Sequence, residues 1–354
     1  MMRILVTGGA GFVGSNLASF FKRDRPDATV VAFDNLRRRG SELALSRLRA
    51  AGVEFRHGDV RNAEDLAEAG DFDLMIECSA EPSVHAGYGA SPAYVINTNL
   101  TGTINCLEAV RRCGASLVFL STSRVYPIAG LRALPLSVAA TRLALDEGAS
   151  GPGWSAAGIG TGFPMAGSRS IYGATKLASE LMIEEYGAMY GLRAVVNRCG
   201  VLTGPWQMGK VDQGFMVLWA ARHLFGGGLS YMGFGGTGAQ VRDVLHVADL
   251  YDLIRIQVDD IGLHAGRTYN VGGGAEVSVS LAELTALCVR RCQRVATLGS
   301  DPETRAADIP WYVTDNAEVT AATGWRPTRS VERIVDDIFH WLEAHADELQ
   351  PVLR

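Results

Sequence analysis

The sequence predicts an α/β protein with a doubly wound parallel sheet and a smaller C-terminal lobe. Two observations carry this prediction. Over the first 200 residues, short apolar runs alternate with stretches typical of helices, a pattern that favours right-handed βαβ units with helices on both faces of the sheet. In addition, the first apolar run leads directly into a turn rich in glycine, as the first strand of a dinucleotide-binding sheet does.

The apolar runs predict strands near residues 2–7, 29–34, 53–57, 73–78, 116–121 and 193–199, and the stretches between them predict helices near 12–24, 41–50, 62–69, 93–113 and 171–190. The alternation becomes irregular after Gly200, and residues 276–354 look mainly helical with loops. We therefore expect a nucleotide-binding domain over 1–200, to which 244–275 returns. The substrate-binding lobe would then comprise 201–243 and 276–354.

The glycine turn follows the apolar run Ile4–Val6 and reads Thr-Gly-Gly-Ala-Gly-Phe-Val-Gly over residues 7–14. Its glycines at 9, 11 and 14 match the dinucleotide fingerprint, and Gly8 offers a second match. Glycine is needed there for the tight turn, for approach to a pyrophosphate and for close packing of helix on strand. The helix that opens at Phe12 and Val13 would offer its free N–H groups to the phosphates. The turn thus predicts a Rossmann-type domain.

Asp34 ends the second apolar run, twenty positions after Gly14. A carboxylate at that strand tip binds the adenosine ribose hydroxyls and repels a 2′-phosphate, which favours NAD over NADP. Arg37, Arg38 and Arg39 follow and would suit NADP, but Asp34 stands where the ribose lies. The alternative is that Asp34 only begins a turn with Asn35.

The global numbers fit an enzyme of the cytoplasm. The chain has 354 residues, enough for two domains or one domain with a lobe, and a net charge of −5 with both signs scattered, which gives no indication of nucleic acid or membrane binding. No apolar run approaches the roughly 20 residues of a membrane span, and the N-terminus reads as a strand rather than a signal peptide. Its six cysteines form no C-x-x-C pair, so we expect free thiols and no metal site.

Two further strand ends carry candidate cofactor residues. Asp59 and Val60 follow the third strand, where Asp59 would meet the adenine amino group or cap the helix that begins near Asn62. Ser79 and Ala80 close the fourth strand, and such small residues let a cofactor pass close by.

The predicted chemistry lies in Tyr172 and Lys176, which share one face of a helix at a spacing of four residues. A free tyrosine has a pKa of about 10, too high for a base at neutral pH, but a nearby ammonium favours the phenolate. Upstream, the strand end Leu120–Ser123 brings hydroxyl groups, and one of them can hold a reacting oxygen against Tyr172. The alternative is an ordinary pair on an exposed helix.

Together these motifs, with Asn99 in its Thr-Asn-Leu-Thr-Gly-Thr segment and the late segment Gln240–Asp249, resemble the extended short-chain dehydrogenase/reductase superfamily over nearly the whole chain. The resemblance implies a tightly held NAD and a nucleotide-sugar substrate. It also implies that Thr122 is the catalytic hydroxyl, Tyr172 the base and Lys176 the residue that binds the nicotinamide ribose. A further implication is a homodimer in which helices 93–113 and 171–190 pair with their copies.

The same resemblance implies the remaining site residues. Those implied to bind the cofactor are Gly8, Gly11, Phe12, Val13, Gly14, Asp34, Asn35, Asp59, Val60, Ser79, Ala80, Asn99, Tyr172, Lys176 and Cys199. Those implied to bind the substrate are Glu81, Ser123, Arg124, Gln213, Gln240 and Arg242, with Arg242 gripping the diphosphate through its planar fork of donors.

The subgroup is indicated by finer features. The 4,6-dehydratases of this superfamily carry Asp-Glu after the catalytic threonine, where this chain has Ser123 and Arg124, so dehydration is not expected. The long insert 127–171 and the segments Asp212–Phe215 and Gln240–His246 resemble the CDP-paratose 2-epimerases. The insert departs from the usual pattern at Pro127, and we expect it to border the sugar as a lid.

The resulting hypothesis is epimerisation by oxidation, re-facing and reduction, at C2 of a CDP-linked hexose or deoxyhexose. A UDP-sugar 4-epimerase would use the same residues on C4. A nucleotide-sugar reductase would usually prefer NADPH, which Asp34 disfavours. A non-catalytic NAD sensor would be expected to lose at least one of Thr122, Tyr172 and Lys176, and the chain keeps all of them.

Overall fold

The computed structural model describes residues 1–210 and 213–353. The chain forms two compact units, each built from several segments. Unit 1 comprises Met1–Val125, Ser170–Arg198 and Leu250–Tyr269, and unit 2 comprises Tyr126–Arg169, Cys199–Asp249 and Asn270–Arg354. The expected domains remain a prediction. The compact units depart from them chiefly at residues 126–169, which belong to unit 2, and by a few residues at 199–200, 244–249 and 270–275.

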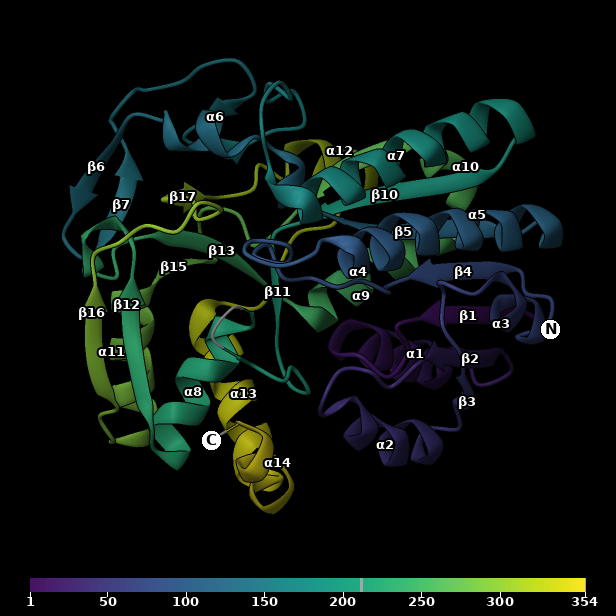
Figure 1. Cartoon of the computed structure of the whole chain (residues 1–354), viewed down its shortest axis with the longest axis horizontal. Helices are drawn as coiled ribbons and strands as arrows, with labels where there is room; N and C mark the ends of the chain where they lie inside the picture. Colours follow the sequence, from purple (N-terminus) through teal and green to yellow (C-terminus); the bar gives the residue numbers. More distant parts are fainter. Residues whose placement is uncertain (211–212, 354) are drawn as a thin grey trace. The chain divides into compact units, whose positions relative to one another are not determined.

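Unit 1 is organised around a seven-stranded sheet with the strand order β14-β10-β5-β4-β1-β2-β3 (Figure 1). Its strands are β1 (Arg3–Thr7), β2 (Thr29–Asp34), β3 (Glu54–His57), β4 (Leu74–Glu77), β5 (Ser116–Thr122), β10 (Arg193–Cys199) and β14 (Arg267–Val271). The pairs around β1 are parallel and in simple register, with Leu5 opposite Val31 on β2 and Met75 on β4. The expected strands are confirmed, and β14 was not predicted.

Helices cover the sheet of unit 1. They are α1 (Phe12–Asp24), α2 (Ala44–Ala50), α3 (Ala63–Glu68), α4 (Ala93–Ile96), α5 (Gly102–Cys113), α7 (Ser170–Tyr190), α9 (Val247–Asp259, from Leu250 on) and α10 (Ile261–His264), and a single π-helical turn, Asn97–Thr101, joins α4 to α5. Alternate strand residues such as Leu5, Met75 and Phe119 join side chains of α3, α5 and α7 in one buried cluster. The residues between them, such as Ile4 and Val118, are also buried. Burial of both faces is what a parallel sheet requires.

Unit 2 is built on a four-stranded sheet of β11 (Val201–Thr203), β13 (Val241–His246), β15 (Ser278–Ser280) and β17 (Trp311–Tyr312), with β13 in contact with each of the others. A separate pair joins β12 (Gly228–Met232) to β16 (Thr297–Asp301). Its helices from residue 215 on are α8 (Phe215–Phe225), α11 (Leu281–Cys292), α12 (Ala317–Thr323), α13 (Val331–Ala344) and α14 (Ala346–Leu353). The helical content expected after residue 276 is therefore present, together with three short strands.

The 127–171 insert is folded rather than open. It forms α6 (Ile128–Arg132), the hairpin β6–β7 (Leu136–Ala139 and Arg142–Leu145) and the short pair β8–β9 (Trp154–Ser155 and Gly158–Ile159). Ile159 bonds through its main chain to Val313 and Asp315, and the Tyr126 hydroxyl donates to Asn270 at 2.7 Å. These long-range bonds attach the insert to the rest of unit 2. Among the described helices, none has the length and apolar character needed to cross a membrane.

Candidate functional site

The glycine turn at the end of β1 has no room for a side chain at Gly8, Gly9 or Gly14. Gly8 has a φ of +63°, and a Cβ there would lie 2.9 Å from the carbonyl group of Cys78 on the neighbouring strand. A Cβ on Gly14 would lie 2.2 Å from the Gly8 carbonyl oxygen. The turn therefore brings the start of α1, at Phe12 and Val13, close against the strand ends. The N–H groups of this first helical turn have no partner within the helix, so they suit the pyrophosphate of NAD.

Asp34 ties the end of β2 to this turn. Its carboxylate accepts the N–H of Ala10 at 3.1 Å and that of Leu36 at 2.8 Å. Burial raises the pKa of Asp34, while the N–H donors of Leu36, Ala10 and Gly11 oppose that shift. Asp34 thus does begin a turn, as the alternative had it, and it also anchors the glycine turn. Its acceptor oxygens lie at the strand end where a ribose would be bound.

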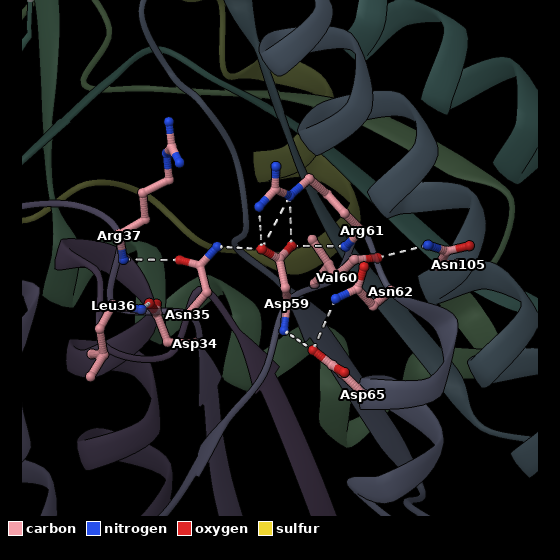
Figure 2. Close-up of polar contacts among 10 residues, drawn as sticks. All are labelled: Asp34, Asn35, Leu36, Arg37, Asp59, Val60, Arg61, Asn62, Asp65 and Asn105. Atoms are coloured by element: carbon pink, nitrogen blue, oxygen red, sulfur yellow. Dashed lines mark hydrogen bonds and ion pairs between the residues drawn. The ribbon is translucent and has the colours of Figure 1, made fainter.

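Asp59 lies at the centre of a polar network beside Asp34 (Figure 2). Its carboxylate accepts bonds from the Arg61 guanidinium, the shortest at 2.6 Å, one from the Arg61 main-chain N–H at 3.0 Å, and one from the Asn35 amide at 2.8 Å. The Arg61 bonds lower the pKa of Asp59 to about 2. The expected helix cap is not formed, because the N-cap residue of α3 is Asn62 and makes no side-chain cap bond.

The residues around Asp59 are also held in place. Val60 is buried, and its carbonyl accepts the Asn105 amide at 2.8 Å. The guanidinium carbons of Arg37 and Arg61 lie 4.2 and 5.2 Å from the ring centre of Tyr94. Arg37 is therefore engaged with an aromatic face, which weakens the argument that it serves a 2′-phosphate.

The end of β4 is held by Asn99 in the π-helical turn. Its side-chain amide accepts the N–H of Glu81 at 2.8 Å and donates to the Glu81 carbonyl at 3.1 Å. The π turn also leaves the Asn99 carbonyl oxygen available to hydroxyls, and Ser179 of α7 donates to it at 3.2 Å. Asn99 therefore fixes the segment after Ser79 and Ala80 and links it to α7. A π-helical turn of this kind often marks a functional site.

The predicted catalytic residues come from β5 and α7, which pack against each other in unit 1. Thr122 ends β5, and its hydroxyl accepts the Arg124 N–H at 3.2 Å. Tyr172 and Lys176 belong to the buried face of α7 and are 8% and 2% exposed. Ser123 forms the turn directly after Thr122 and is buried too. The hydroxyl groups and the Tyr-Lys pair therefore lie on packed elements, in positions shielded from water. The idea of an exposed helix pair is wrong.

One feature beside these residues was missed by sequence reasoning. Glu180, one helical turn beyond Lys176, is buried and forms an ion pair with Arg198 at 2.7 Å. Ser121, the neighbour of Thr122, also donates to Glu180. This network fixes α7 to β5 and β10. The sequence does show Arg198 as a charged residue within the apolar run of β10, but it does not show that Glu180 is the partner of Arg198.

The substrate residues expected after residue 200 lie in unit 2. Gln213 exchanges main-chain bonds with Lys210, whereas Asp212 of the same motif lies outside the described residues. The Gln240 amide donates to the Met232 carbonyl at 3.0 Å, and its buried oxygen has no hydrogen-bond partner among the described residues. Arg242 donates to the carbonyls of Val241 and Ile309 at 2.7 and 2.6 Å. A role for Arg242 in gripping a diphosphate therefore remains a prediction.

The last expected cofactor residue is Cys199, which ends β10 and is buried in unit 2 by the division above. No cluster of three or more side chains suited to a metal ion occurs in the part of the chain that the structure describes.

Comparison with known proteins places this geometry among nucleotide-sugar enzymes. A family model described as "NAD dependent epimerase/dehydratase family" matches residues 4–272. A CDP-paratose 2-epimerase from Salmonella typhi is 30% identical over 352 residues, which is 96% of this chain and 99% of that protein. A dTDP-glucose 4,6-dehydratase from Mycobacterium tuberculosis is 31% identical over 276 residues, covering 78% of this chain and 73% of that protein.

Solved structures agree with the fold. A UDP-glucose 4-epimerase from Thermus thermophilus in complex with NAD aligns with a TM-score of 0.75 and 25% identity, over 97% of this chain and 99% of that one. A dTDP-glucose 4,6-dehydratase from Streptomyces venezuelae with NAD bound aligns with a TM-score of 0.78 and 26% identity over the whole of both chains.

Proposed function

Because the chain belongs to the NAD-dependent epimerase/dehydratase family, we propose that it is a nucleotide-sugar epimerase that oxidises its substrate transiently and reduces it again on the opposite face. The observation that carries this proposal is the burial of Tyr172 and Lys176 on the face of α7 that packs against β5 and its Thr122 end. NAD, when bound, supplies the acceptor and the donor of the hydride.

The residues of this chain would move and hold the proton. The Tyr172 phenolate takes the proton of a sugar hydroxyl, and the Thr122 hydroxyl hydrogen-bonds the same oxygen and orients it. The Lys176 ammonium favours the phenolate form of Tyr172 because an opposite charge nearby stabilises it. After the keto-sugar has rotated to present its opposite face, Tyr172 returns the proton to the oxygen. Because the hydride is also returned to the sugar, the reaction has no net redox change.

Dehydration is disfavoured by the residues after Thr122. Loss of water from a sugar needs an acid and a base at the reacting carbons, and the chain has Ser123 and Arg124 there. This supports an isomerase rather than a lyase, although 4,6-dehydratases are among the relatives.

The finer proposal is C2 of a CDP-linked hexose or deoxyhexose. It is supported by the relative from Salmonella typhi, which aligns over nearly all of both chains, and by the insert of residues 127–171, which is long enough to form its own helix and strand pairs. The competing proposal is a UDP-sugar 4-epimerase, which would use the same Tyr172 and is favoured by the likeness to the Thermus thermophilus enzyme.

Isotope labelling distinguishes C2 from C4. CDP- and UDP-sugars deuterated at C2 or at C4 are incubated with the enzyme in water and in deuterium oxide, and turnover is followed by NMR. We expect a primary isotope effect only with the C2 label on a CDP-sugar, and we expect the label to stay on C2 without solvent exchange. An effect confined to the C4 label would replace this proposal with the 4-epimerase. Before the assay, mass spectrometry of the ligand released on denaturation identifies any cofactor or sugar nucleotide that the protein retains.

A further inference from the structure

Unit 1 contains a buried carboxyl group that the mechanism above does not use. Glu77 is the last residue of β4 and is 2% exposed. One of its carboxyl oxygens accepts the Thr103 hydroxyl at 2.5 Å, and the other is buried with no hydrogen-bond partner among the described residues. An ionised carboxylate in such surroundings is costly unless a charge compensates it. An ionised Glu77 therefore needs a partner of opposite charge.

The geometry of the sheet identifies that partner. Glu77 lies opposite Phe119 of β5 in the parallel register, and paired residues of neighbouring strands project from the same face of a sheet. The Lys176 ammonium lies over the Phe119 ring, 3.9 Å from its centre. Glu77 and Lys176 thus enter the same buried space from β4 and α7. Burial raises the pKa of Glu77, while the charge of Lys176 and the Thr103 bond lower it.

The other ionisable groups around this space do not replace Glu77. Burial raises the pKa of the Cys106 thiol on α5, and Glu77 raises it further, so the thiol stays neutral. Glu180, one turn along α7 from Lys176, is neutralised by Arg198 and also binds Ser121. Tyr172, one turn earlier, is the group on which Lys176 is proposed to act.

We propose that Glu77 is a positioning residue whose carboxylate is the buried counter-charge of Lys176 and keeps that lysine in its ammonium form. A lysine in a desolvated site tends to lose its proton, and a neutral amine would no longer stabilise the Tyr172 phenolate. Glu77 acts through Lys176 and touches neither the substrate nor the reacting atoms. The inference rests on the function proposed above for Lys176.

The lysine content of the chain allows a direct test. Its lysines are Lys22, Lys176 and Lys210, so protein labelled with carbon-13 at the lysine Cε gives few signals, and loss of one signal in Lys176→Arg assigns Lys176. The full-length native protein and Glu77→Gln are titrated by NMR. Glutamine keeps an acceptor for Thr103 and removes only the charge. We expect the titration midpoint of Lys176 to fall by roughly one pH unit in the variant, with Lys22 and Lys210 unchanged.

Two further variants keep the result interpretable. Glu77→Met makes the same charge change without a buried polar oxygen and serves if the glutamine variant does not fold. Cys106→Ala disturbs the packing of the same space without removing a charge, and it should leave the Lys176 midpoint in place. A midpoint that stays or rises in both Glu77 variants overturns the inference.

The titration needs no substrate, so it separates this inference from the proposed function. If no nucleotide sugar is epimerised but the Lys176 midpoint falls, the function is wrong and the counter-charge stands. If epimerisation is found and the midpoint does not move, only the counter-charge is wrong. If a substrate is found, the pH at which kcat declines on the alkaline side should also be lower in Glu77→Gln. A purely structural role would not cause this shift.

Discussion

At the scale of single residues, the Tyr172 hydroxyl carries the proposed proton transfer. Tyr172→Phe removes only that oxygen from a buried position on α7, so the fold and NAD binding should be retained. Turnover should fall by about a hundredfold or more, the usual contribution of a positioned acid–base group. Steady-state assays measure the loss, and the NAD content of the purified variant is the control. Turnover near the native rate would show that another group moves the proton.

Asp34 should decide the choice between NAD and NADP. Calorimetry should show that the native protein binds NAD⁺ much more tightly than NADP⁺, and that Asp34→Ala narrows this gap because the carboxylate no longer repels a 2′-phosphate. Asp34→Asn is the matched control, since its amide oxygen can still accept the Ala10 N–H that Asp34 accepts. A native preference for NADP⁺ would contradict the role given to Asp34.

The local parts of the site were predictable and its long-range partners were not. Gly8, Gly14 and Asp34 follow from spacing in one stretch of chain, and Tyr172 and Lys176 follow from one helical turn. The Arg61 bonds to Asp59 and the pairing of Arg198 with Glu180 depend on which segments the fold brings together. A sequence shows the charge at each position but not the charge opposite it.

At the scale of elements, periodicity predicted strands and helices best where the apolar pattern within one segment is enough to indicate that the segment is buried. The strands β1, β2, β4 and β5 are apolar runs, whereas β3 reads Glu-Phe-Arg-His, and the bounds of all five agree with expectation to within one or two residues. By contrast, β14 reads Arg-Thr-Tyr-Asn-Val, a mixed run that becomes a strand only through its place beside β10. The strands of the insert are only four or two residues long, too short for periodicity to predict, so tertiary context decided them.

The strand β13 contains a buried acid with a consequence for stability. Asp243 is 0% exposed, and its burial raises its pKa to about 6, above the usual range of an aspartate. A raised pKa in the folded state means that this group favours folding at low pH, and that its contribution is lost as pH rises through about 6.

Asp243→Asn should remove this dependence on pH. Relative to the native protein, the variant should gain stability between pH 4 and pH 7, by up to about 3 kcal/mol if the whole shift is released. Urea unfolding of both proteins across this range measures the difference, and subtraction removes the contributions of other groups such as His246. A constant difference, or one that falls with rising pH, would contradict the assignment.

At the scale of the whole molecule, the outer side of α7 is a candidate interface. Leu181 and Met189 of this helix are 57% and 67% exposed, and Tyr190 is 52% exposed, whereas Leu107 and Val110 of α5 are buried in the core. Large apolar side chains left exposed on one helix are typical of an association surface. An isologous dimer would cover them.

We therefore expect a homodimer by light scattering at micromolar concentration, and Leu181→Arg should shift it towards monomer without loss of the fold. Arg49→Ala, an exposed change on α2 and outside the two helices expected to pair, serves as a comparison for an altered surface charge. A monomeric native protein under these conditions would count against the dimer.

The expected domain boundaries remain a prediction, and the two compact units agree with them only in part. The segment Leu250–Tyr269 of unit 1 lies within the expected return, residues 244–275. The separation of residues 126–169 from that domain was not foreseen, because no run of Gly, Pro or charge marks the point after Val125. Compactness is set by contacts such as those of Ile159 with Val313 and Asp315, which lie far apart in sequence.

The chain passes between its two units at residues 125–126, 169–170, 198–199, 249–250 and 269–270. No single cut in the gene therefore separates one unit from the other. A recombination event that exchanged one stretch of coding sequence would replace parts of both units at once and leave each with mismatched packing. In relatives with this architecture, specificity for a new sugar should thus arise through substitutions and loop insertions, such as the one between Tyr126 and Ser170. It should not arise by exchange of a whole lobe.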